Sequence, residues 1–489
     1  MQSHWELTIA LESGARTPLF LQISRAIADD IRRTRLRPGQ RLPGSRTLAR
    51  SLGVSRNTTV TAYAELIAQG WVTPDRARGM FVAVSSPDAV TAPALSRRPI
   101  ESAPDRVGYA VPPRARAADA EPRSQPRARF QLSGALPDVR LVPVGVLARA
   151  YRRALGHAEL LSYATDARGD LRLRERVAEM VSALRGVAAT PDTVLITRGS
   201  QMGLHLAARV LAPTGERIAV EALGYPRIWD ALAAAGAHLV PVPVDEAGLR
   251  VDRLAALVQK QPIRAVYLTP HHQFPTTVVL SARRRLELLE LARRHRFAIL
   301  EDDVDHDFHY EGRPVLPLAS LDEAGVVIYV STLSKVLAPG LRLGFVVAPR
   351  PVVDLLARTR EAVDRHGDQV LERAVAELIE DGELQRHARR MRRIYLARRD
   401  ALLRALASDL GSVLRVRTAP GGLALWARAA AGVDVERWAQ RARARGVVIQ
   451  TARQFAFDGR ARPYLRLGFS RHSERELQEA ARLLRAARP

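Results

Sequence analysis

The segment from residue 84 to residue 128 carries eight prolines and almost no apolar periodicity. Proline fixes φ and removes a backbone donor, so such a segment favours an extended, solvated linker over a packed core. The stretches on either side must then fold separately. We predict a compact domain over residues 1–83, a linker over residues 84–128 and a larger domain over residues 129–489.

Composition limits what these parts can be. Hydrophobic residues make up 47% of the 489 residues, which suits globular domains and is too high for a largely disordered chain. No apolar run approaches the roughly 20 residues that span a bilayer, and glutamates interrupt the stretch where a signal peptide would carry its apolar core. We therefore expect a cytoplasmic protein without a membrane segment. The absence of cysteine excludes disulfides, a thiolate nucleophile and cysteine-ligated metals.

The formal net charge of +24 favours a polyanionic partner. However, the basic residues are nearly all arginine, since Lys260 and Lys335 are the only lysines in the sequence. The positive charge is also spread along the whole chain rather than gathered in one domain. Charge alone is therefore weak evidence for nucleic-acid binding.

Residues 17–83 show the pattern of three helices followed by a hairpin. Apolar residues recur every four positions over Leu19–Arg33, which predicts the first helix. Ser45 and Ser55 are good N-caps for two further helices, Thr47–Leu52 and Arg56–Gln69. Two short helices joined through a glycine are typical of a helix-turn-helix, whose second helix enters the DNA major groove by its N-terminal residues.

The start of the third helix, Ser55-Arg56-Asn57-Thr58, is rich in donors for phosphates and base edges. This region resembles the winged helix-turn-helix of GntR-type transcription regulators. The resemblance implies that Arg46, Arg56, Asn57 and Thr58 contact DNA and that a wing near Gly79 reaches the minor groove. The alternative is that these arginines belong to a solvated face. The matching residues are Pro18-Leu19, Gln22-Ile23, Leu36–Gly39, Leu42–Arg46, Leu48-Ala49, Gly53–Thr58, Ala62-Tyr63 and Gly70–Val72.

Residues 129–489 alternate β-branched runs with amphipathic stretches such as Arg283–His295, in which Leu286, Leu289 and Ala292 follow a helical spacing. This alternation predicts an α/β domain with a mostly parallel sheet and helices on both faces. From about residue 350 the pattern turns helical and then α+β, which predicts a second, smaller lobe. The predicted strands are Thr193–Thr197, Arg217–Glu221, His238–Val244, Ala265–Thr269, Ala298–Asp303, Val326–Ser331 and Gly344–Ala348.

Lys335 is the most informative residue of the larger domain. Unlike arginine, a lysine amine can lose its proton and form a Schiff base. Hydroxyl residues, Thr332 and Ser334 among them, precede Lys335, and Arg342 follows it, a combination that suits a phosphate dianion. A phosphate beside a Schiff-base lysine indicates pyridoxal 5′-phosphate, whereas Lys260 reads as an ordinary surface lysine.

Three other motifs agree with this cofactor. The turn before Ser200 and Gln201 opens a helix whose amides could hold the phosphate, although it could also be a simple cap. Asp302 ends a strand, where a carboxylate can pair with a pyridinium nitrogen; acidic strand ends also bind magnesium. Tyr225 offers an aromatic face for stacking on the cofactor ring. From these motifs we predict the cofactor and no metal.

Over roughly residues 130–489 the chain resembles fold-type I, aspartate-aminotransferase-like proteins. Together with the first domain, the whole chain resembles the MocR subfamily of GntR-type regulators. The resemblance implies that Lys335 is the Schiff-base lysine and that Asp302 pairs with the pyridine nitrogen. It further implies that Tyr225 stacks on the cofactor ring. His272 and Gln273, in a segment similar to the family's TPxHQFPTG, would lie near the cofactor hydroxyl. The residues that would bind the phosphate are Ser200, Gln201, Thr332, Ser334 and Arg342. Arg466 and Arg227 match arginines on the effector side.

The sequence departs from the family pattern at two positions. Val304 stands where the family has a tyrosine that hydrogen-bonds the cofactor hydroxyl, which argues against efficient transamination. Thr277 stands where the family favours glycine.

We interpret the chain as a DNA-binding transcription regulator that uses pyridoxal phosphate at Lys335 to sense a small amine, an amino acid or the cofactor itself. A homodimer is expected, because fold-type I sites lie at dimer interfaces. The alternative is an active aminotransferase with an accessory DNA-binding module. A nucleic-acid-packaging protein would fit the charge but would not explain Lys335 or the α/β domain.

Overall fold

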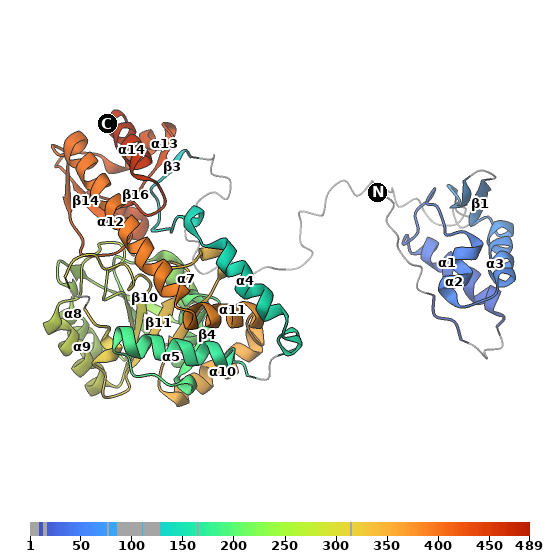
Figure 1. Cartoon of the computed structure of the whole chain (residues 1–489), viewed down its shortest axis with the longest axis horizontal. Helices are drawn as coiled ribbons and strands as arrows, with labels where there is room; N and C mark the ends of the chain where they lie inside the picture. The colour runs from blue at the N-terminus through green and yellow to red at the C-terminus, as the bar shows by residue number, and fades with distance from the viewer. Residues whose placement is uncertain are drawn as a thin grey trace. The chain divides into compact units, whose positions relative to one another are not determined.

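The computed structural model describes residues 9–12, 17–75, 78–85, 110, 128–163, 166–312 and 315–489. The chain divides into two compact units, Met1–Pro113 and Arg114–Pro489 (Figure 1). Most of the predicted linker lies outside the described residues. Among the described residues, no helix combines the length and the apolar character needed to cross a bilayer.

The first unit is a three-helix domain with a small hairpin, as the sequence predicts. Its elements are α1 (Leu19–Arg32), α2 (Ser45–Leu52), α3 (Arg56–Ala68), β1 (Val72–Asp75) and β2 (Gly79–Val82). The predicted cap is confirmed at Ser55, whose hydroxyl accepts from the Thr58 amide. It is wrong at Ser45, which is the first residue of α2, while Gly44 occupies the capping position.

The helices of this unit pack around one apolar core that includes Ile23, Ile27, Leu48, Leu66 and Trp71. Two polar side chains of α3 bond to the backbone at the start of α2. The buried Tyr63 hydroxyl donates to the Pro43 carbonyl at 2.6 Å, and Thr59 donates to the Ser45 carbonyl at 2.9 Å. The angle between the two helices is therefore held by hydrogen bonds as well as by packing.

The second unit is built on a seven-stranded sheet in the order β4-β12-β11-β10-β9-β5-β6. Neighbouring strands are parallel except around β12, which is antiparallel to both β4 and β11. The prediction of a mostly parallel sheet is confirmed. The strands are β4 (Val194–Thr197), β5 (Arg217–Glu221), β6 (His238–Val242), β9 (Ala265–Leu268), β10 (Ala298–Asp303), β11 (Val327–Thr332) and β12 (Gly344–Val347).

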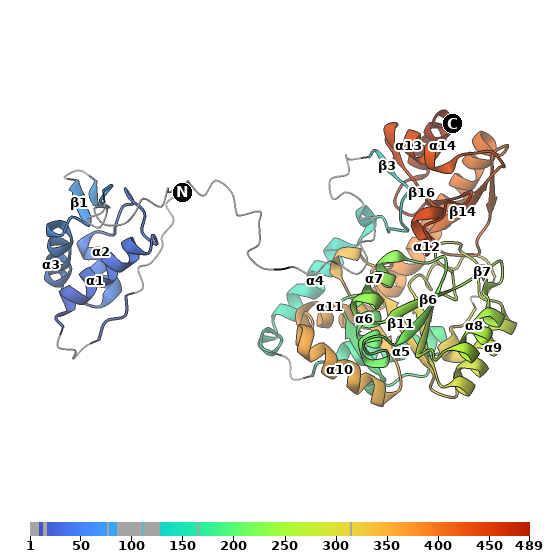
Figure 2. The same cartoon turned by 180° about the vertical axis from the view of Figure 1, so that it is seen from behind.

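Helices cover both faces of this sheet, because side chains alternate between the faces along each strand. Leu300 packs with the core under α6 (Ser200–Leu211), α7 (Pro226–Ala234) and α10 (Arg350–Asp364), the face toward the viewer in Figure 2. Ile299 packs on the opposite face with α8 (Val251–Lys260) and α9 (Ala282–His295). Helices α5 (Leu171–Arg185) and α11 (Gln369–Glu380) cover the rest of that second face.

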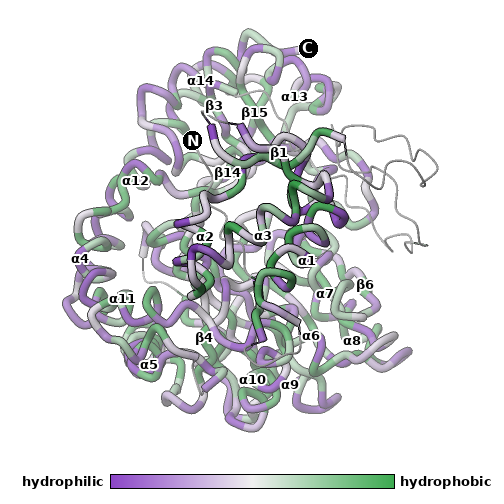
Figure 3. The backbone as a smooth tube through the Cα atoms, turned by 90° about the vertical axis from the view of Figure 1, so that its right-hand side faces the viewer, coloured by the Kyte–Doolittle hydropathy of each residue, from purple (hydrophilic) through white to green (hydrophobic). Residues whose placement is uncertain are grey.

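The smaller lobe follows the long helix α12 (Glu383–Leu410). Its four-stranded sheet has the order β13-β14-β17-β16, formed by Leu414–Arg417, Ala424–Ala429, Tyr464–Gly468 and Gln450–Thr451. Helices α13 (Val435–Ala444) and α14 (Glu474–Ala486) complete it. The remaining elements are α4 (Val144–Leu155), β3 (Phe130–Gln131), β7 (Val244–Asp245), β8 (Gly248–Leu249) and β15 (Val447–Val448). Outer helices such as α4 and α14 alternate between hydrophilic and hydrophobic residues, as one-sided burial requires (Figure 3).

Candidate functional site

The residues predicted to bind the cofactor come together where β4, β10 and β11 end. Thr332 at the end of β11 pairs with Gly344 at the start of β12, which in turn pairs with Thr197 at the end of β4. Lys335 follows β11 by three residues. The antiparallel strand β12 thus brings the segments around Ser200, Lys335 and Arg342 to one edge of the sheet.

The side chain of Lys335 is half-buried, and its Nζ donates to the Ala135 carbonyl at 2.7 Å. The pKa of this amine is lowered to about 8, first because burial disfavours the charged form and then because Arg466 repels it. The carboxylates of Asp302 and Asp305 oppose the shift. An amine with this pKa reaches its neutral, nucleophilic form much more readily than an ordinary lysine.

Strand alternation separates the three acids at the end of β10. Asp302 shares a face with Leu300, whereas Glu301 accepts from the amides of Leu318 and Ala319 on the other face, at 2.7 and 2.9 Å. Asp303 accepts from the Tyr329 hydroxyl at 2.7 Å. The three carboxylates therefore do not converge as one magnesium site would require.

Asp302 is buried and keeps one oxygen without a partner. Its Oδ2 accepts from the Tyr267 hydroxyl at 3.1 Å, while its Oδ1 has no hydrogen-bond partner among the residues that the structure describes. Burial raises the pKa of this carboxyl to about 7, and the neighbouring Asp303 and Asp305 contribute. A buried, unpaired carboxylate oxygen is the group that a pyridinium N–H would satisfy, so this side chain fits the predicted cofactor.

A cradle suited to a phosphate lies at the start of α6. Gly199 precedes this helix with φ 78°, a left-handed conformation that favours glycine. Arg342 donates from Nη2 to the Arg198 carbonyl at 2.9 Å, and the hydroxyls of Thr332 and Ser334 lie 3.0 Å apart. A Cβ at Gly344 would lie 2.8 Å from the Gly199 backbone, so close approach requires glycine there. The first amides of α6, at Ser200 and Gln201, complete a set of donors for a dianion.

Arg466 lies on β17 of the smaller lobe and is 5% exposed. In the part of the chain that the structure describes, its Nε and Nη1 are buried without hydrogen-bond partners, and its guanidinium carbon lies 4.3 Å from the centre of the Phe274 ring. Burial lowers the pKa of this guanidinium to about 10. An unpaired buried guanidinium is well suited to bind a carboxylate in a bidentate manner.

Aromatic side chains line the space next to Arg466. The Tyr225 ring lies 5.0 Å from the Phe274 ring, centre to centre. Burial raises the pKa of Tyr225, and the charge of Arg227 opposes that shift, which places Arg227 close to the same ring. Arg227 itself lies in the exposed first turn of α7.

The two residues predicted near the cofactor hydroxyl have different surroundings. The amide of Gln273 donates to the Leu223 carbonyl at 2.7 Å and its oxygen accepts from the Thr276 amide at 3.2 Å, so it joins its own loop to the segment after β5. His272 bonds through Nδ1 to Asp305 at 2.9 Å. Thr277, which replaces the family's glycine, has a φ of 62°. Val304 is half-buried at the end of β10.

The sequence did not single out Tyr267, Phe274 or Asp305. Tyr267 looked like a core residue of its strand, and only the pairing of β9 with β10 places its hydroxyl on Asp302. Phe274 lay within a quoted motif, but its contact with Arg466 joins two lobes nearly two hundred residues apart. Asp305 could have been suspected from its acidic neighbourhood alone.

The predicted DNA-contacting residues lie on the first unit. Arg46, in the first turn of α2, and Ser55, Arg56 and Asn57, at the start of α3, are exposed. Thr58 is half-buried, and its hydroxyl lies 2.8 Å from that of Ser55. Gly79 begins β2 with φ 109°. The exposed donors at the start of α3 give it the character of a recognition helix.

Two family models match the chain. The model described as "Aminotransferase class I and II" matches residues 134–484, and the one described as "Bacterial regulatory proteins, gntR family" matches residues 19–82. The chain is 30% identical to the probable rhizopine catabolism regulatory protein MocR of Rhizobium meliloti, over 98% of this chain and 95% of that protein. It is 35% identical to the HTH-type transcriptional regulator TauR of Rhodobacter capsulatus, over 98% of each chain.

A solved structure extends the comparison to the second unit. LysN, an α-aminoadipate aminotransferase from Thermus thermophilus complexed with N-(5′-phosphopyridoxyl)-L-leucine, is 29% identical, with a TM-score of 0.68. The match covers 73% of this chain and 91% of that chain. Fold and site thus define a gntR-family helix-turn-helix domain joined to an aminotransferase class I and II domain. The chain belongs to the MocR-type family of GntR regulators.

Proposed function

We propose that this protein is a DNA-binding transcription regulator that holds pyridoxal phosphate at Lys335 and senses a small amine or amino acid. The observation that carries the proposal is the pairing of Lys335, an amine of lowered pKa, with Asp302, a buried carboxylate that has a free oxygen. The phosphate cradle of Ser200, Gln201, Thr332, Ser334 and Arg342 surrounds the same edge of the sheet. Pyridoxal phosphate would supply an aldehyde that condenses with amines and a ring that accepts electrons.

Each residue has a distinct task in this proposal. Lys335 would bind the aldehyde carbon, Asp302 would hold the proton on the ring nitrogen, and Tyr225 would stack on the ring. His272 and Gln273 remain predicted near the ring hydroxyl, with Gln273 acting through its loop. Arg466 would bind the carboxylate of an amino-acid effector because its guanidinium is buried and unpaired, and Arg227 would contact the effector from α7.

Sensing would couple these contacts to DNA binding. An amine that displaces Lys335 frees its side chain, and a carboxylate on Arg466 links the smaller lobe to the larger one. A ligand that prefers one arrangement of the lobes shifts the population of both, and this shift would reach the DNA through a homodimer that carries two first units. Arg46, Ser55, Arg56, Asn57, Thr58 and the wing at Gly79 would contact the operator.

The test is a titration of the purified protein with pyridoxal phosphate and then with a panel of amines and amino acids. Visible absorbance and binding to the upstream DNA of its own gene are followed together. Lys335→Ala should abolish the yellow imine absorbance, while Lys260→Ala should leave it intact. An unchanged imine spectrum in Lys335→Ala, or a spectral response to amines that never alters DNA binding, would contradict the proposal.

A second candidate is an active aminotransferase that carries a DNA-binding module. It is favoured by the retention of Lys335, Asp302 and Arg466 in a domain similar to LysN. Val304 weighs against it, since a valine cannot donate a hydrogen bond to the cofactor hydroxyl. Production of a keto acid over many turnovers from an amino acid and an acceptor keto acid would support the enzyme.

A further inference from the structure

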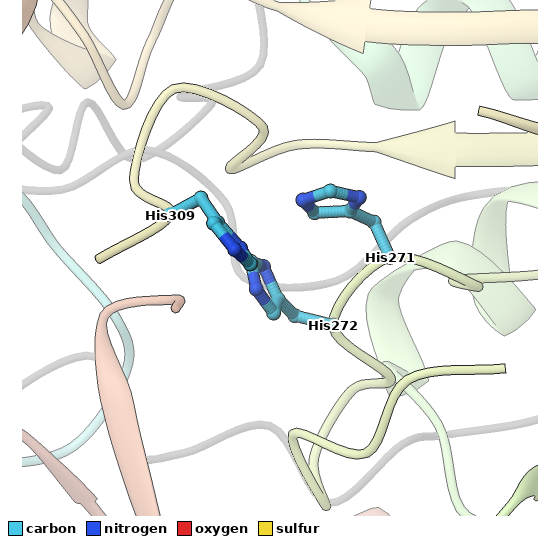
Figure 4. Close-up of side chains that lie close together, drawn as sticks. All are labelled: His271, His272 and His309. Atoms are coloured by element: carbon cyan, nitrogen blue, oxygen red, sulfur yellow. The ribbon is translucent and has the colours of Figure 1, made fainter. Parts of the chain in front are cut away.

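Four of the twelve histidines gather beside the proposed cofactor pocket. His271 and His272 follow β9, whereas His306 and His309 follow β10. The ring centres of His271 and His272 lie 4.4 Å apart, those of His271 and His309 lie 6.0 Å apart, and those of His272 and His309 lie 6.2 Å apart. Figure 4 shows these three rings converging from their two segments.

The ring nitrogens of this cluster are buried and poorly satisfied. His271 is 3% exposed, and neither of its nitrogens has a hydrogen-bond partner among the described residues. Within the same part of the chain, the Nε2 of His272 is also buried without a partner. Buried polar atoms without partners cost free energy, so their accumulation at one point indicates a ligand that would satisfy them.

The contact between His272 and Asp305 has the form of a metal-site support. Asp305 holds Nδ1 at 2.9 Å, which fixes the ring orientation and leaves Nε2 as the free ligand atom. Histidines that bind metals usually donate their other ring nitrogen to a carboxylate in this way. Gly421 packs beside this nitrogen, and an added Cβ there would lie 2.3 Å from Nε2, so this close approach requires glycine.

We propose that His271, His272 and His309 form a binding site for a divalent transition-metal ion of the zinc class. One ligand atom from each lies within 4.8 Å of the others. Three imidazoles with an open fourth position are a typical zinc arrangement, and imidazole also suits nickel and copper, whereas magnesium prefers oxygen. His272 would bind the metal through Nε2, so it would then act on the cofactor hydroxyl only indirectly.

A competing set, His271, Asp303 and His306, shares one ligand with this site. One oxygen of its carboxylate is already engaged, since Asp303 Oδ2 accepts from the Tyr329 hydroxyl at 2.7 Å and lies 3.1 Å from His306 Nδ1. The structure therefore favours His309 over His306 as the third ligand. Asp305, which orients His272, also favours the charged forms of Lys335 and Arg466 and so opposes the lowering of their pKa values.

The experiment uses the untagged full-length chain, zinc as the probe and competition with a chelating indicator. One zinc per chain is expected, and cobalt should give the strong visible absorption of a tetrahedral site. His271→Gln and His309→Gln should each weaken zinc binding by more than about 100-fold, and Asp305→Asn by about 10–100-fold. His306→Gln and the exposed control His295→Gln should change it by less than about threefold.

Circular dichroism identifies any variant that fails to fold, and the half-buried His309 gives the variant least prone to do so. Loss of zinc binding in folded His309→Gln supports the site. A loss in His306→Gln with retention in His309→Gln overturns the ligand assignment. Absence of stoichiometric zinc binding to the wild-type chain overturns the site altogether.

Discussion

The electrostatic setting of Lys335 determines when it can react. Burial and Arg466 lower the pKa of this amine to about 8, against the pull of Asp302 and Asp305. A lysine on the surface keeps a pKa near 10.4. At physiological pH the Lys335 amine therefore spends a substantial fraction of its time neutral.

This setting predicts the pH dependence of cofactor capture. The neutral amine attacks the aldehyde, so the rate at which the apo-protein combines with pyridoxal phosphate should rise about tenfold per pH unit below pH 8 and level off above it. Stopped-flow absorbance measures this rate. A model lysine amide, as control, should continue to rise to about pH 10. A protein profile that also rises past pH 9.5 would show that the pKa of Lys335 is ordinary.

Thr277 shows a different kind of residue-scale effect. Its φ of 62° lies in the left-handed region, which costs a β-branched residue roughly 1–2 kcal/mol. Glycine adopts this conformation freely but loses more entropy on folding, by about 0.4–1 kcal/mol. Thr277→Gly should therefore raise the free energy of unfolding by about 0.5–1 kcal/mol.

Chemical denaturation of the parent protein, of Thr277→Gly and of one control variant tests this expectation. The matched control is Thr418→Gly, because Thr418 is exposed and has no positive φ. That substitution should destabilise the protein through the entropy of the unfolded chain alone. Equal destabilisation by both substitutions would show that Thr277 carries no backbone strain.

At the scale of single elements, α3 is the part that we propose to contact DNA most directly. Its first turn exposes Arg56 and Asn57, and Ser55 caps it. If Arg56 reads a base edge, Arg56→Ala should weaken operator binding by about 1–3 kcal/mol and leave binding to random DNA much less affected. Fluorescence anisotropy on both DNAs measures this difference at fixed salt.

The control is Arg114→Ala in the predicted linker. This substitution should weaken DNA binding only slightly, and to the same extent for operator and random DNA. If Arg56→Ala lost equal affinity for operator and random DNA, Arg56 would contact only phosphates and would not read a base edge.

The elements also show how much of the fold could be predicted from the sequence. All seven predicted strands of the sheet are present within two residues of their expected ends, because β-branched runs between turn residues signal buried strands strongly. The face of α9 was harder to predict. Leu286, which follows the helical spacing of apolar residues, is 61% exposed, while Arg285 is buried and donates to the carbonyls of Leu280, Leu316 and Pro270. A buried arginine satisfied by loop carbonyls leaves no trace in apolar periodicity.

The residues of the candidate site likewise fall into those that the sequence could indicate and those that it could not. Lys335, Asp302 and the phosphate cradle could be named because each sits in a local motif at a strand end or helix start. Tyr267 and the histidine cluster could not, because their meaning depends on strand order and on contacts between distant segments. His306 and His309 are unremarkable in sequence until β10 and β9 pair and bring them beside His271.

For the whole molecule, the separation of the DNA-reading unit from the larger unit has consequences for affinity. Among the described residues, the first unit has an apolar core formed by its own side chains. If residues 84–128 form the linker that the sequence predicts, about 45 residues would have a root-mean-square span of roughly 40 Å or more, depending on stiffness. That length exceeds one turn of DNA, about 34–36 Å, so two linked units could reach half-sites that are not adjacent.

A fragment of residues 1–83 should therefore fold but bind operator DNA about 10²–10⁴-fold more weakly than the full chain, because a dimer of the larger unit supplies effective concentration to the second binding event. Sedimentation measures the expected dimer, and anisotropy compares fragment and full chain at the same salt. Lengthening the linker with Gly-Ser repeats should lower the affinity only gradually, as a smooth function of its length. A fragment that binds as tightly as the intact protein would show that dimerisation through the larger unit is not the source of affinity. An abrupt loss on modest lengthening would show instead that the two units act as one rigid body.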